Sequence, residues 1–541
     1  MSLINVENLS LDIGDTPILK DIDLSVSKGE VLGLVGESGS GKSMTALAMM
    51  QLLPRAATTN GQIQFDGRNL LTSSEEAMCQ IRGNEIGMVF QEPMTALNPV
   101  KTIGEQVAEG VRWHKSVSRA EAEEVARTML ERVGLPESRF PLTRFPHELS
   151  GGQRQRVVIA IACALKPKLL IADEPTTALD VVLQAQILDL LKDLINDYDM
   201  GLLLISHDLA VVAEMADRIA IMRSGEIVEA GETGATLSEQ KHPYTRQLAE
   251  ASTHRPTRSE PQKEERQEII LSVRDVKKHY RLPRENIFKP ASFFKAVDGV
   301  SFDIAAGQSI SLVGRSGCGK STLARLILAL DKPTEGEVEF MSGVTSQMDE
   351  TTLRPYRRNM QIVFQDPYGS FDPRHKVERL VTEPLHLLDE KPSGKARTDL
   401  AVAALESVGL SSSDLAKYPH EFSGGQRQRI SIARAIINKP KLIVCDEPVS
   451  ALDVSVRAHI LDLFADLSER LGVAYLFITH DLNVARAITE EVMVMHEGLI
   501  VERGSTEDVL SSPQSEAAKN LVSAMPVLEA AIARRNSKFT A

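Results

Sequence analysis

The sequence predicts an α/β fold in which one domain, built on a mainly parallel sheet, occurs twice in tandem. The same group of short motifs is found in each half of the chain, and apolar runs alternate with helix-like segments in both halves. In each half, one apolar run leads directly into a glycine-rich turn. Such alternation of strand and helix patterns is typical of parallel sheets whose connections are helices.

The predicted core strands are short apolar runs. VLGLV (31–35) and SISLV (309–313) each precede a glycine-rich turn, and LLIA (169–172) and LIVC (442–445) each end in an acidic residue. Continuous apolar runs of this length are expected for strands that are covered on both faces. QRQRVVIAIACAL (153–165) is long enough for a helix whose later turns are buried.

The repeat is that of a duplicated domain. GESGSGKS recurs as GRSGCGKS, LSGGQRQR as FSGGQRQR, and ISHDL as ITHDL. From the serine of the second motif to the histidine of the third, the copies match without a gap. A charged, proline-containing stretch between the copies is predicted to be a linker. We therefore expect domains at 1–251 and 269–525, a linker at 252–268 and a C-terminal tail at 526–541.

The composition excludes several classes of protein. The chain has 541 residues, 43% of them hydrophobic and 25% charged, with a net charge of −13, a field that disfavours nucleic acid as a partner. No run approaches the ~20 apolar residues of a membrane-spanning helix, and the N-terminus lacks the pattern of an export signal. The four cysteines form no CxxC pair, so neither a disulfide framework nor a zinc site is expected. If the protein works at a membrane, we expect it to do so as a soluble subunit.

Both glycine-rich turns match GxxxxGK[ST], in which backbone N–H groups converge on phosphate oxygens at a helix N-terminus. Lys42 and Lys320 are expected to reach the β- and γ-phosphates of ATP, and Ser43 and Ser321 to ligate Mg²⁺. The ATP-binding residues predicted from these loops are Gly36, Glu37, Ser38, Gly39, Ser40, Gly41, Lys42 and Ser43 in the first half, and Gly314, Arg315, Ser316, Gly317, Cys318, Gly319, Lys320, Ser321 and Thr322 in the second.

An acidic pair and a later histidine follow apolar strands in each half. The aspartate of the pair is placed to hold Mg²⁺, directly or through water. The adjoining glutamate is the candidate to polarise the attacking water, and the histidine is expected to contact phosphate and to take part in catalysis. These candidates are Asp173, Glu174 and His207 in the first half, and Asp446, Glu447 and His480 in the second.

With a glutamine in each VFQ motif (Gln91 and Gln365), the whole set resembles the ATP-binding-cassette (ABC) ATPases. The LSGGQ signature is the specific element, because other phosphate-loop proteins lack it. The resemblance covers nearly the whole chain and implies two P-loop NTPase domains, each with an antiparallel β subdomain and an α-helical signature subdomain. It also implies that both glutamines contact ATP and Mg²⁺.

In that family, two domains close head to tail, and each ATP lies between one phosphate loop and the other domain's signature. The resemblance therefore implies a head-to-tail pairing within this chain, with loops 177–180 and 450–453 crossing between the sites. Neither site lacks its glutamate, histidine or signature serine, so two hydrolytic sites are expected. The implied signature residues are Ser423, Gly424, Gly425 and Gln426 for the first site, and Ser150, Gly151, Gly152 and Gln153 for the second.

Finer resemblance concerns the type of transporter. KHPYTRQL (241–248) and DPYGSFDPR (366–374) are similar to segments of oligopeptide and dipeptide importer ATPases, and the fused form looks most like the Yej-type peptide and microcin C importers. Glutathione and nickel importers are near alternatives. A translation-associated tandem cassette is a distant one, because such proteins carry a long helical linker.

The importer resemblance implies partners and a location. We expect two membrane permease subunits, a periplasmic or other extracytoplasmic substrate-binding protein, and a peripheral position at the cytoplasmic face of the inner membrane. The cofactors implied are ATP and Mg²⁺. No iron–sulfur cluster is expected, because the cysteines that hold one in some relatives are not present after either cassette.

Two positions are expected to make the ATP sites differ. ABC ATPases usually stack adenine on an aromatic residue before the phosphate loop, a place held by Tyr280 in the second half and by Ile13 in the first. Base–aromatic stacking is worth ~1–3 kcal/mol, so weaker binding is expected at the first site. Cys318 lies in the second phosphate loop, where a nearby helix N-terminus is expected to lower the thiol pKa and raise its reactivity.

Overall fold

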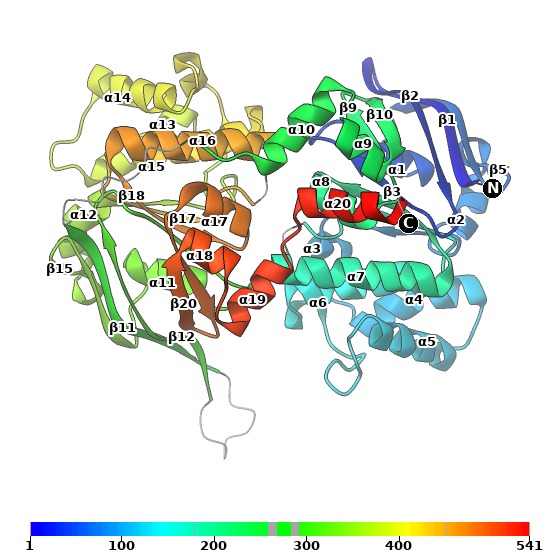
Figure 1. Ribbon diagram of the computed structural model, residues 1–541, viewed down its shortest axis with the longest axis horizontal. Helices are drawn as coiled ribbons and strands as arrows, with labels where there is room; N and C mark the ends of the chain where they lie inside the picture. Colours follow the sequence, from blue (N-terminus) through cyan, green and yellow to red (C-terminus); the bar gives the residue numbers. More distant parts are fainter. Residues whose placement is uncertain (1, 178, 258–267, 283–291, 451, 540–541) are drawn as a thin grey trace.

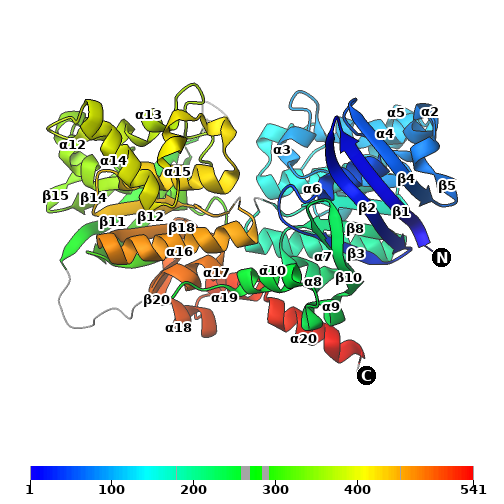
Figure 2. The same ribbon diagram turned by 90° about the horizontal axis from the view of Figure 1, so that it is seen from above.

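The computed structural model describes residues 2–177, 179–257, 268–282, 292–450 and 452–539. The two halves of the chain lie side by side, the first coloured blue to green and the second green to orange (Figure 1, Figure 2). Each half contains a six-stranded, mainly parallel sheet and a four-stranded antiparallel sheet. The predicted α/β fold, with one domain architecture built twice, is confirmed.

The large sheet of the first half has the order β10-β9-β3-β8-β7-β6, parallel except for the β9–β10 pair at one edge. The small sheet has the order β2-β1-β4-β5. The strands are β1 (Ser2–Ile13), β2 (Thr16–Ser27), β3 (Val31–Val35), β4 (Ala57–Phe65), β5 (Arg68–Asn69), β6 (Ile86–Val89), β7 (Leu169–Asp173), β8 (Gly201–Ser206), β9 (Arg218–Arg223) and β10 (Glu226–Glu232).

Helices cover the large sheet, and those from α4 to α6 form a separate helical region around the signature motif (Figure 1). The helices of the first half are α1 (Lys42–Met49), α2 (Glu75–Ile81), α3 (Pro93–Ala96), α4 (Ile103–Lys115), α5 (Arg119–Arg132), α6 (Gly151–Cys163), α7 (Val181–Tyr198), α8 (Leu209–Met215), α9 (Thr233–Glu239) and α10 (Pro243–Thr253).

The second half repeats this plan, with sheet orders β16-β17-β18-β13-β19-β20 and β12-β11-β14-β15. Its strands are β11 (Ile269–Arg281), β12 (Phe293–Ala305), β13 (Ser309–Val313), β14 (Glu335–Phe340), β15 (Gly343–Val344), β16 (Met360–Val363), β17 (Leu442–Asp446), β18 (Ala474–Thr479), β19 (Glu491–His496) and β20 (Leu499–Ser505). Its helices are α11 (Lys320–Ile327), α12 (Glu350–Asn359), α13 (Val377–Val381), α14 (Gly394–Ser407), α15 (Gly424–Ile436), α16 (Val454–Leu471), α17 (Leu482–Ile488), α18 (Thr506–Ser511), α19 (Glu516–Ser523) and α20 (Leu528–Phe539).

The central strands are buried along their whole length. Every residue of β3, β7 and β8 is buried, as is every residue of β13 and β18. Helices and the small sheet cover both faces, which explains why these strands read as continuous apolar runs rather than as an alternating pattern.

Each half also packs an end segment against the other half. Helix α10 of the first half lies on α16 of the second, where His254 Nε2 is 2.7 Å from Asp462 Oδ1. In return, α20 lies on α8 and α9 and buries Leu528 and Ala531 in the core of the first half (Figure 1). The predicted tail at 526–541 therefore contains a docked helix. Residues 258–267 of the predicted linker lie outside the described residues.

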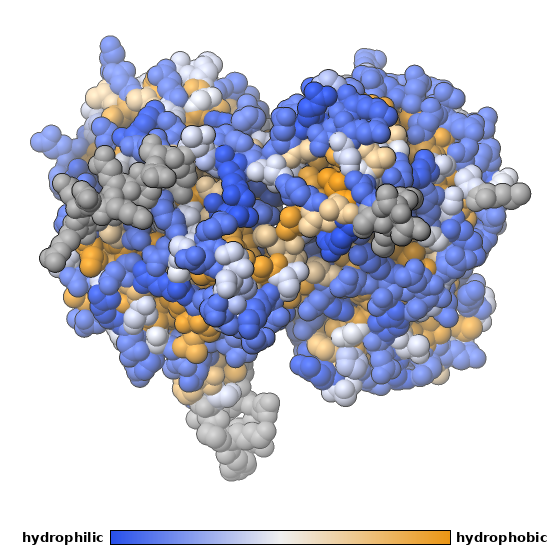
Figure 3. Space-filling model, in the orientation of Figure 1, coloured by the Kyte–Doolittle hydropathy of each residue, from blue (hydrophilic) through white to orange (hydrophobic). Residues whose placement is uncertain are grey.

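Apolar side chains gather along the seam between the halves, where this C-terminal segment crosses (Figure 3). One core cluster there is shared, because Val181 of α7 packs with Ala518 and Leu521 of α19 and with apolar residues of the second half. The halves are therefore joined by buried apolar contacts as well as by the connecting chain.

Candidate active site

The candidate site of the first half lies where β3, β7 and β8 end together. Parallel pairing sets Val35 opposite Ser206, and Asp173 opposite Ile205. The phosphate loop, the acidic pair and the histidine loop therefore leave the sheet at the same edge, which is where ligands bind in open α/β sheets. Strands β13, β17 and β18 repeat this arrangement in the second half.

The phosphate loop is folded as a cradle around its lysine. Lys42 Nζ donates to the carbonyl oxygens of Gly36 (2.7 Å) and Glu37 (2.9 Å), and Lys320 makes the corresponding pair of bonds in the second loop. Gly36 has no room for a side chain, because a Cβ there would lie 2.2 Å from a carbonyl oxygen of β9. Burial lowers the pKa of Lys42, opposed chiefly by the charge of Glu174. The loop thus holds a poorly solvated cation, suited to binding phosphate.

Glu174 is at the centre of a hydrogen-bond network. It adopts a left-handed backbone conformation (φ 48°) directly after β7. Its Oε2 accepts from Gln91 Nε2 (2.9 Å) and Thr177 Oγ1 (2.8 Å), and its Oε1 lies 3.2 Å from His207 Nδ1. The structure thus brings the predicted glutamine, glutamate and histidine of the first half into direct contact.

The interaction between Glu174 and His207 counteracts the effect of burial on the pKa of each side chain. Burial alone would raise the pKa of Glu174, but the hydrogen bond and charge of His207, with the charge of Lys42, lower it to about 2. Burial would lower the pKa of His207, but the hydrogen bond to Glu174 raises it. The pair is therefore an ionised carboxylate held by a histidine that is readily protonated.

Asp173 fits the predicted role of Mg²⁺ ligand. Its side chain is buried, and Oδ1 has no hydrogen-bond partner among the residues that the structure describes. Burial raises the pKa of Asp173, and the neighbouring Ser43 hydroxyl opposes this. A carboxylate and a hydroxyl oxygen are ligands that Mg²⁺ prefers. Gln91, the third predicted ligand, donates a hydrogen bond to Glu174, the residue that follows Asp173.

The second half repeats these contacts. Glu447 (φ 49°) accepts from Gln365 Nε2 (2.8 Å) and lies 3.1 Å from His480 Nδ1. Ser321 Oγ lies 3.4 Å from Asp446 Oδ1. Burial would raise the pKa of Glu447, but the hydrogen bond from His480 lowers it, as in the first half.

The two phosphate loops meet the crossing loops of the opposite half. The backbone N–H and Oγ of Ser38 both donate to Asp453 Oδ1 (2.9 Å each), and the backbone N–H of Ser316 donates to Asp180 Oδ2 (2.9 Å). A cavity of about 210 Å³ at the seam between the halves is lined by both His207 and His480. Residues 178 and 451 of the crossing loops lie outside the described residues.

The signature motifs form the exposed N-termini of α6 and α15. Ser150 caps α6 by accepting from the N–H of Gln153 (3.4 Å), whose Oε1 accepts from the N–H of Ser150 (3.0 Å). Ser423 and Gln426 repeat this capping box on α15. The contacts described above between each phosphate loop and the opposite half come from aspartates of the crossing loops, so the pairing of each signature with the opposite phosphate loop stays a prediction.

Sequence reasoning missed one hydrogen bond that distinguishes the two candidate catalytic carboxylates, those of Glu174 and Glu447. Thr177 was predicted only as part of a crossing loop, yet its hydroxyl binds the carboxylate of Glu174. Its counterpart Ser450 donates instead to the main-chain oxygen of Glu447 (3.1 Å). The TTALD and VSALD sequences show the change of residue type, but the partner of each hydroxyl depends on backbone geometry.

Ile13 and Tyr280, the residues expected to differ in adenine stacking, occupy equivalent positions in the two halves. Asn8 in β1 and Asp275 in β11 share a left-handed φ (48° and 44°) at the same irregularity of the strand pairing, which fixes the alignment of the two strands. Ile13 and Tyr280 then fall at the same place, near the end of each strand. Tyr280 is 39% exposed; its hydroxyl donates to Asp331 Oδ2 (3.2 Å), and the ammonium of Lys278 lies 5.3 Å from the ring centre.

We expect Tyr280→Ala to weaken nucleotide binding at the second site by about fivefold, the equivalent of ~1 kcal/mol of lost stacking. Ile13→Tyr should tighten the first site. Site-resolved titration with a nucleotide analogue measures both, and Trp113→Ala, which removes an exposed aromatic ring elsewhere, is the control. Equal affinities that respond to neither change would show that adenine is held by another residue.

The expected lowering of the Cys318 pKa is wrong. The side chain is only 8% exposed, and burial raises the pKa of the thiol although Lys320 and loop N–H groups act against it. We therefore expect a maleimide to modify the partly exposed Cys79 first, and Cys79→Ser to remove the fast phase of labelling. Peptide mass spectrometry measures the rate at which each cysteine is labelled. Fast labelling of Cys318 would contradict the burial argument.

The ABC transporter family pattern matches residues 19–177 and 297–450, once in each half. The chain belongs to the ABC transporter family. This ABC protein is 43% identical to the peptidoglycan transport ATP-binding protein YejF of Agrobacterium fabrum, over 98% of its own length and 97% of the relative's. It is also 43% identical to the glutathione import ATP-binding protein GsiA of Escherichia coli K12, over 98% of its length and 90% of the relative's. A solved structure titled as a dimeric bacterial ABC transporter cassette is 32% identical over 44% of the chain, with a TM-score of 0.40.

Membership of the ABC family identifies the chain as an ATPase whose activity is coupled to transport. Proteins of this family bind ATP with Mg²⁺, in agreement with the oxygen-rich environment of Asp173. Within the described part of this ABC protein, no helix combines the length and the apolar character needed to cross a bilayer.

Proposed function

We propose that this ABC ATPase is the energy-supplying subunit of an importer of short peptides. The observation that carries the proposal is near full-length similarity, at 43% identity, to two import and transport ATPases. One of these is named for peptidoglycan transport and the other for glutathione import, and both cargoes contain a short peptide. Glutathione import is the second candidate, because GsiA is as similar as YejF.

Two ATP molecules are proposed to bind between the halves, each on a phosphate loop and beneath the opposite signature. Lys42 and the loop N–H groups would hold the phosphates, and Ser43, Gln91 and Asp173 would hold Mg²⁺, whose charge lowers the cost of the developing negative charge. The second half supplies the corresponding residues. The contacts of Asp180 and Asp453 support this pairing, because they already join each phosphate loop to the opposite half.

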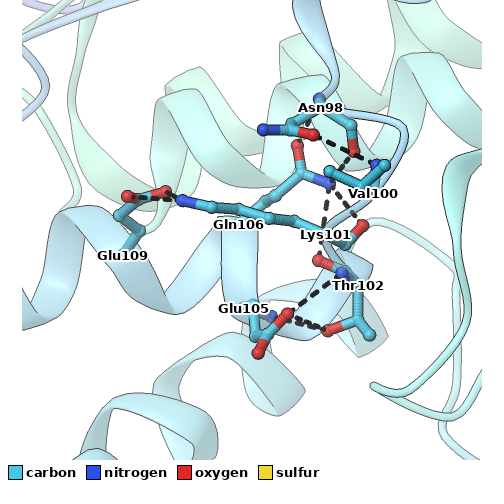
Figure 4. A network of polar contacts seen from close by, with 7 residues as sticks. All are labelled: Asn98, Val100, Lys101, Thr102, Glu105, Gln106 and Glu109. Atoms are coloured by element: carbon cyan, nitrogen blue, oxygen red, sulfur yellow. Dashed lines mark hydrogen bonds and ion pairs between the residues drawn. The ribbon is translucent and has the colours of Figure 1, made fainter.

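The segment after Gln91 is the proposed link to a permease. The side chain of Gln106 accepts from the N–H of Asn98 (2.8 Å) and donates to the carbonyls of Asn98 (3.1 Å) and Lys101 (3.0 Å), and Thr102 caps α4 (Figure 4). This bracing fixes a short surface loop on which Val100 is 80% exposed. A rigid loop joined to Gln91 could pass movements at Glu174 to a membrane partner.

The proposed assembly contains two permease subunits and an extracytoplasmic substrate-binding protein, with the ATPase at the cytoplasmic face of the inner membrane. The test is uptake by the assembled transporter in proteoliposomes, with labelled muropeptide, labelled glutathione and a nickel chelate as competing cargoes. ATP-dependent uptake of muropeptide or other short peptides supports the proposal, and uptake of glutathione alone favours the second candidate. Import of the nickel chelate alone would overturn peptide import, and Lys42→Ala with Lys320→Ala is the inactive control.

A further inference from the structure

Tyr244, near the start of α10, is buried directly beneath the first phosphate loop. Its side chain is 2% exposed, and its hydroxyl accepts the backbone N–H of Glu37 (3.2 Å). The guanidinium of Arg223, at the end of β9, lies 4.8 Å from the centre of its ring. The carbonyl oxygen of Glu37 accepts from Lys42. Tyr244 and Lys42 therefore hold two neighbouring backbone groups of one loop residue.

The position of Tyr244 is fixed by β10. The carboxylate of Glu229 accepts the backbone N–H groups of Lys241 (3.0 Å) and His242 (3.1 Å), and the hydroxyl of Thr245 also binds it. These contacts anchor the start of α10, so the tyrosine ring has little freedom to move away from the loop.

The second half has the same anchor but lacks the tyrosine. There the carboxylate of Glu502, on β20, accepts the backbone N–H groups of Gln514 (2.9 Å) and Ser515 (2.7 Å) at the start of α19. In the first half, Tyr244 lies two positions after His242, whose N–H is anchored. In the second half, the residue two positions after the anchored Ser515 is Ala517. The matching anchors make the two positions structurally equivalent, and alanine has no group that could reach Arg315, the counterpart of Glu37.

The other end of α10 reaches the second half. There it packs on α16, and His254 contacts Asp462. Helix α16 begins directly after Asp453, which accepts two hydrogen bonds from Ser38 in the same phosphate loop. A closed path of contacts therefore runs from the first phosphate loop through Tyr244 and α10 to α16 and back through Asp453.

We propose that Tyr244 is a positioning residue of the first ATP site alone, holding its phosphate loop in the form that accepts nucleotide and tying that loop to the second half through α10. The inference rests on the proposed role of residues 36–43 as an ATP site. Such a role for Tyr244 makes the two ATP sites differ in how their phosphate loops are held, a difference that the shared motifs do not reveal. The first loop is braced from inside its own half and across the seam, whereas the second has the contact of Asp180 without a tyrosine.

The test is photolabelling of the full chain with 8-azido-ATP and Mg²⁺, in a Glu174→Gln, Glu447→Gln background so that nucleotide is not consumed. A protease site placed within residues 258–267 allows the halves to be separated after irradiation, and the label on each is counted. Tyr244→Phe removes only the hydroxyl. The matched control is Tyr475→Phe, because Tyr475 is also buried but its hydroxyl has no hydrogen-bond partner in the described part of the chain.

Tyr244→Phe is expected to raise the half-saturating concentration for the first half about fivefold, or ~1 kcal/mol for one hydrogen bond, to leave the second half unchanged, and to lower the melting temperature by no more than ~2–4 °C. Tyr475→Phe should change neither half. An equal shift in both halves, or a shift that only follows a lower melting temperature, would show a merely structural role and overturn the inference. No response in the first half would also overturn it. Absence of any label on the first half, before substitution, would refute the proposed ATP site itself.

Discussion

Replacing Glu174 and Glu447 together by glutamine is expected to stop steady-state ATP hydrolysis while ATP remains bound. Glutamine keeps the shape of glutamate but can neither carry the negative charge nor accept a proton from water. General acid–base catalysis contributes roughly 10²–10⁴-fold to rates, so turnover should fall at least about 100-fold. The phosphate loops are untouched by the change, so affinity for ATP should be retained.

The contacts of Glu174 also bear on when its carboxylate could act as a base. With His207 at 3.2 Å, Glu174 has a pKa of about 2 and is a weak base. If Glu174 is the proposed base, we expect water activation to need His207 to move off the carboxylate, toward the negative charge of a γ-phosphate. In the structure, His207, Gln91 and Thr177 all contact this carboxylate.

The measurement is phosphate release at saturating ATP, together with retention of labelled ATP on the purified protein. The control is Glu30→Gln, which alters another partly buried, hydrogen-bonded carboxylate, bound to Ser27 and Arg218 at the opposite end of β3. Glu30→Gln should keep most of the activity. Undiminished hydrolysis in the double variant would remove both glutamates from the mechanism.

Detaching α20 is expected to destabilise the first half rather than the second, although α20 belongs to the end of the chain. Ala531 is 1% exposed against the core of the first half, and Ala531→Asp would bury an unpaired carboxylate there. An uncompensated buried charge costs several kcal/mol, so undocking of the helix is the cheaper outcome. Losing the burial of Leu528 and Ala531 would then remove ~2–3 kcal/mol of stabilisation. This loss would lower the melting temperature of the first half by roughly 5–10 °C.

Calorimetry, combined with limited proteolysis to assign the transitions to each half, measures this shift. Ala533→Asp introduces the same charge on the exposed face of the same helix and is the matched control. A similar fall in melting temperature for both variants would show that charge alone destabilises α20. No fall for Ala531→Asp would mean that the packing of α20 contributes nothing to the first half.

The fold and the grouping of site residues could be predicted because strong local patterns carry them. The run that ends at Val35 and the run that directly precedes Asp173 are apolar, and such runs predict strands buried on both faces. Once these strands are parallel, their carboxyl ends meet at one edge and bring the motifs together. The motif residues themselves have the chemistry that phosphate and Mg²⁺ require.

The features that could not be predicted depend on contacts between distant parts of the chain. The sequence from Leu528 onward is a short amphipathic stretch, and nothing local tells which half it covers. The environment of Cys318 depends on how closely neighbouring strands approach the loop, and here burial outweighs the helix N-terminus. The hydroxyl of Tyr244 reaches Glu37 across about two hundred residues of sequence, so its spacing carries no signal.

The docking of α20 on the first half has a consequence for biosynthesis. The core of the first half includes residues of α20, a helix that is translated after the whole second half. At ~5–20 residues per second, the first half must wait on the order of tens of seconds, while the whole second half is translated, before its packing is complete. During that interval the surface of α8 and α9 that α20 covers is exposed to solvent, so chaperone binding to nascent chains should persist until α20 has been translated.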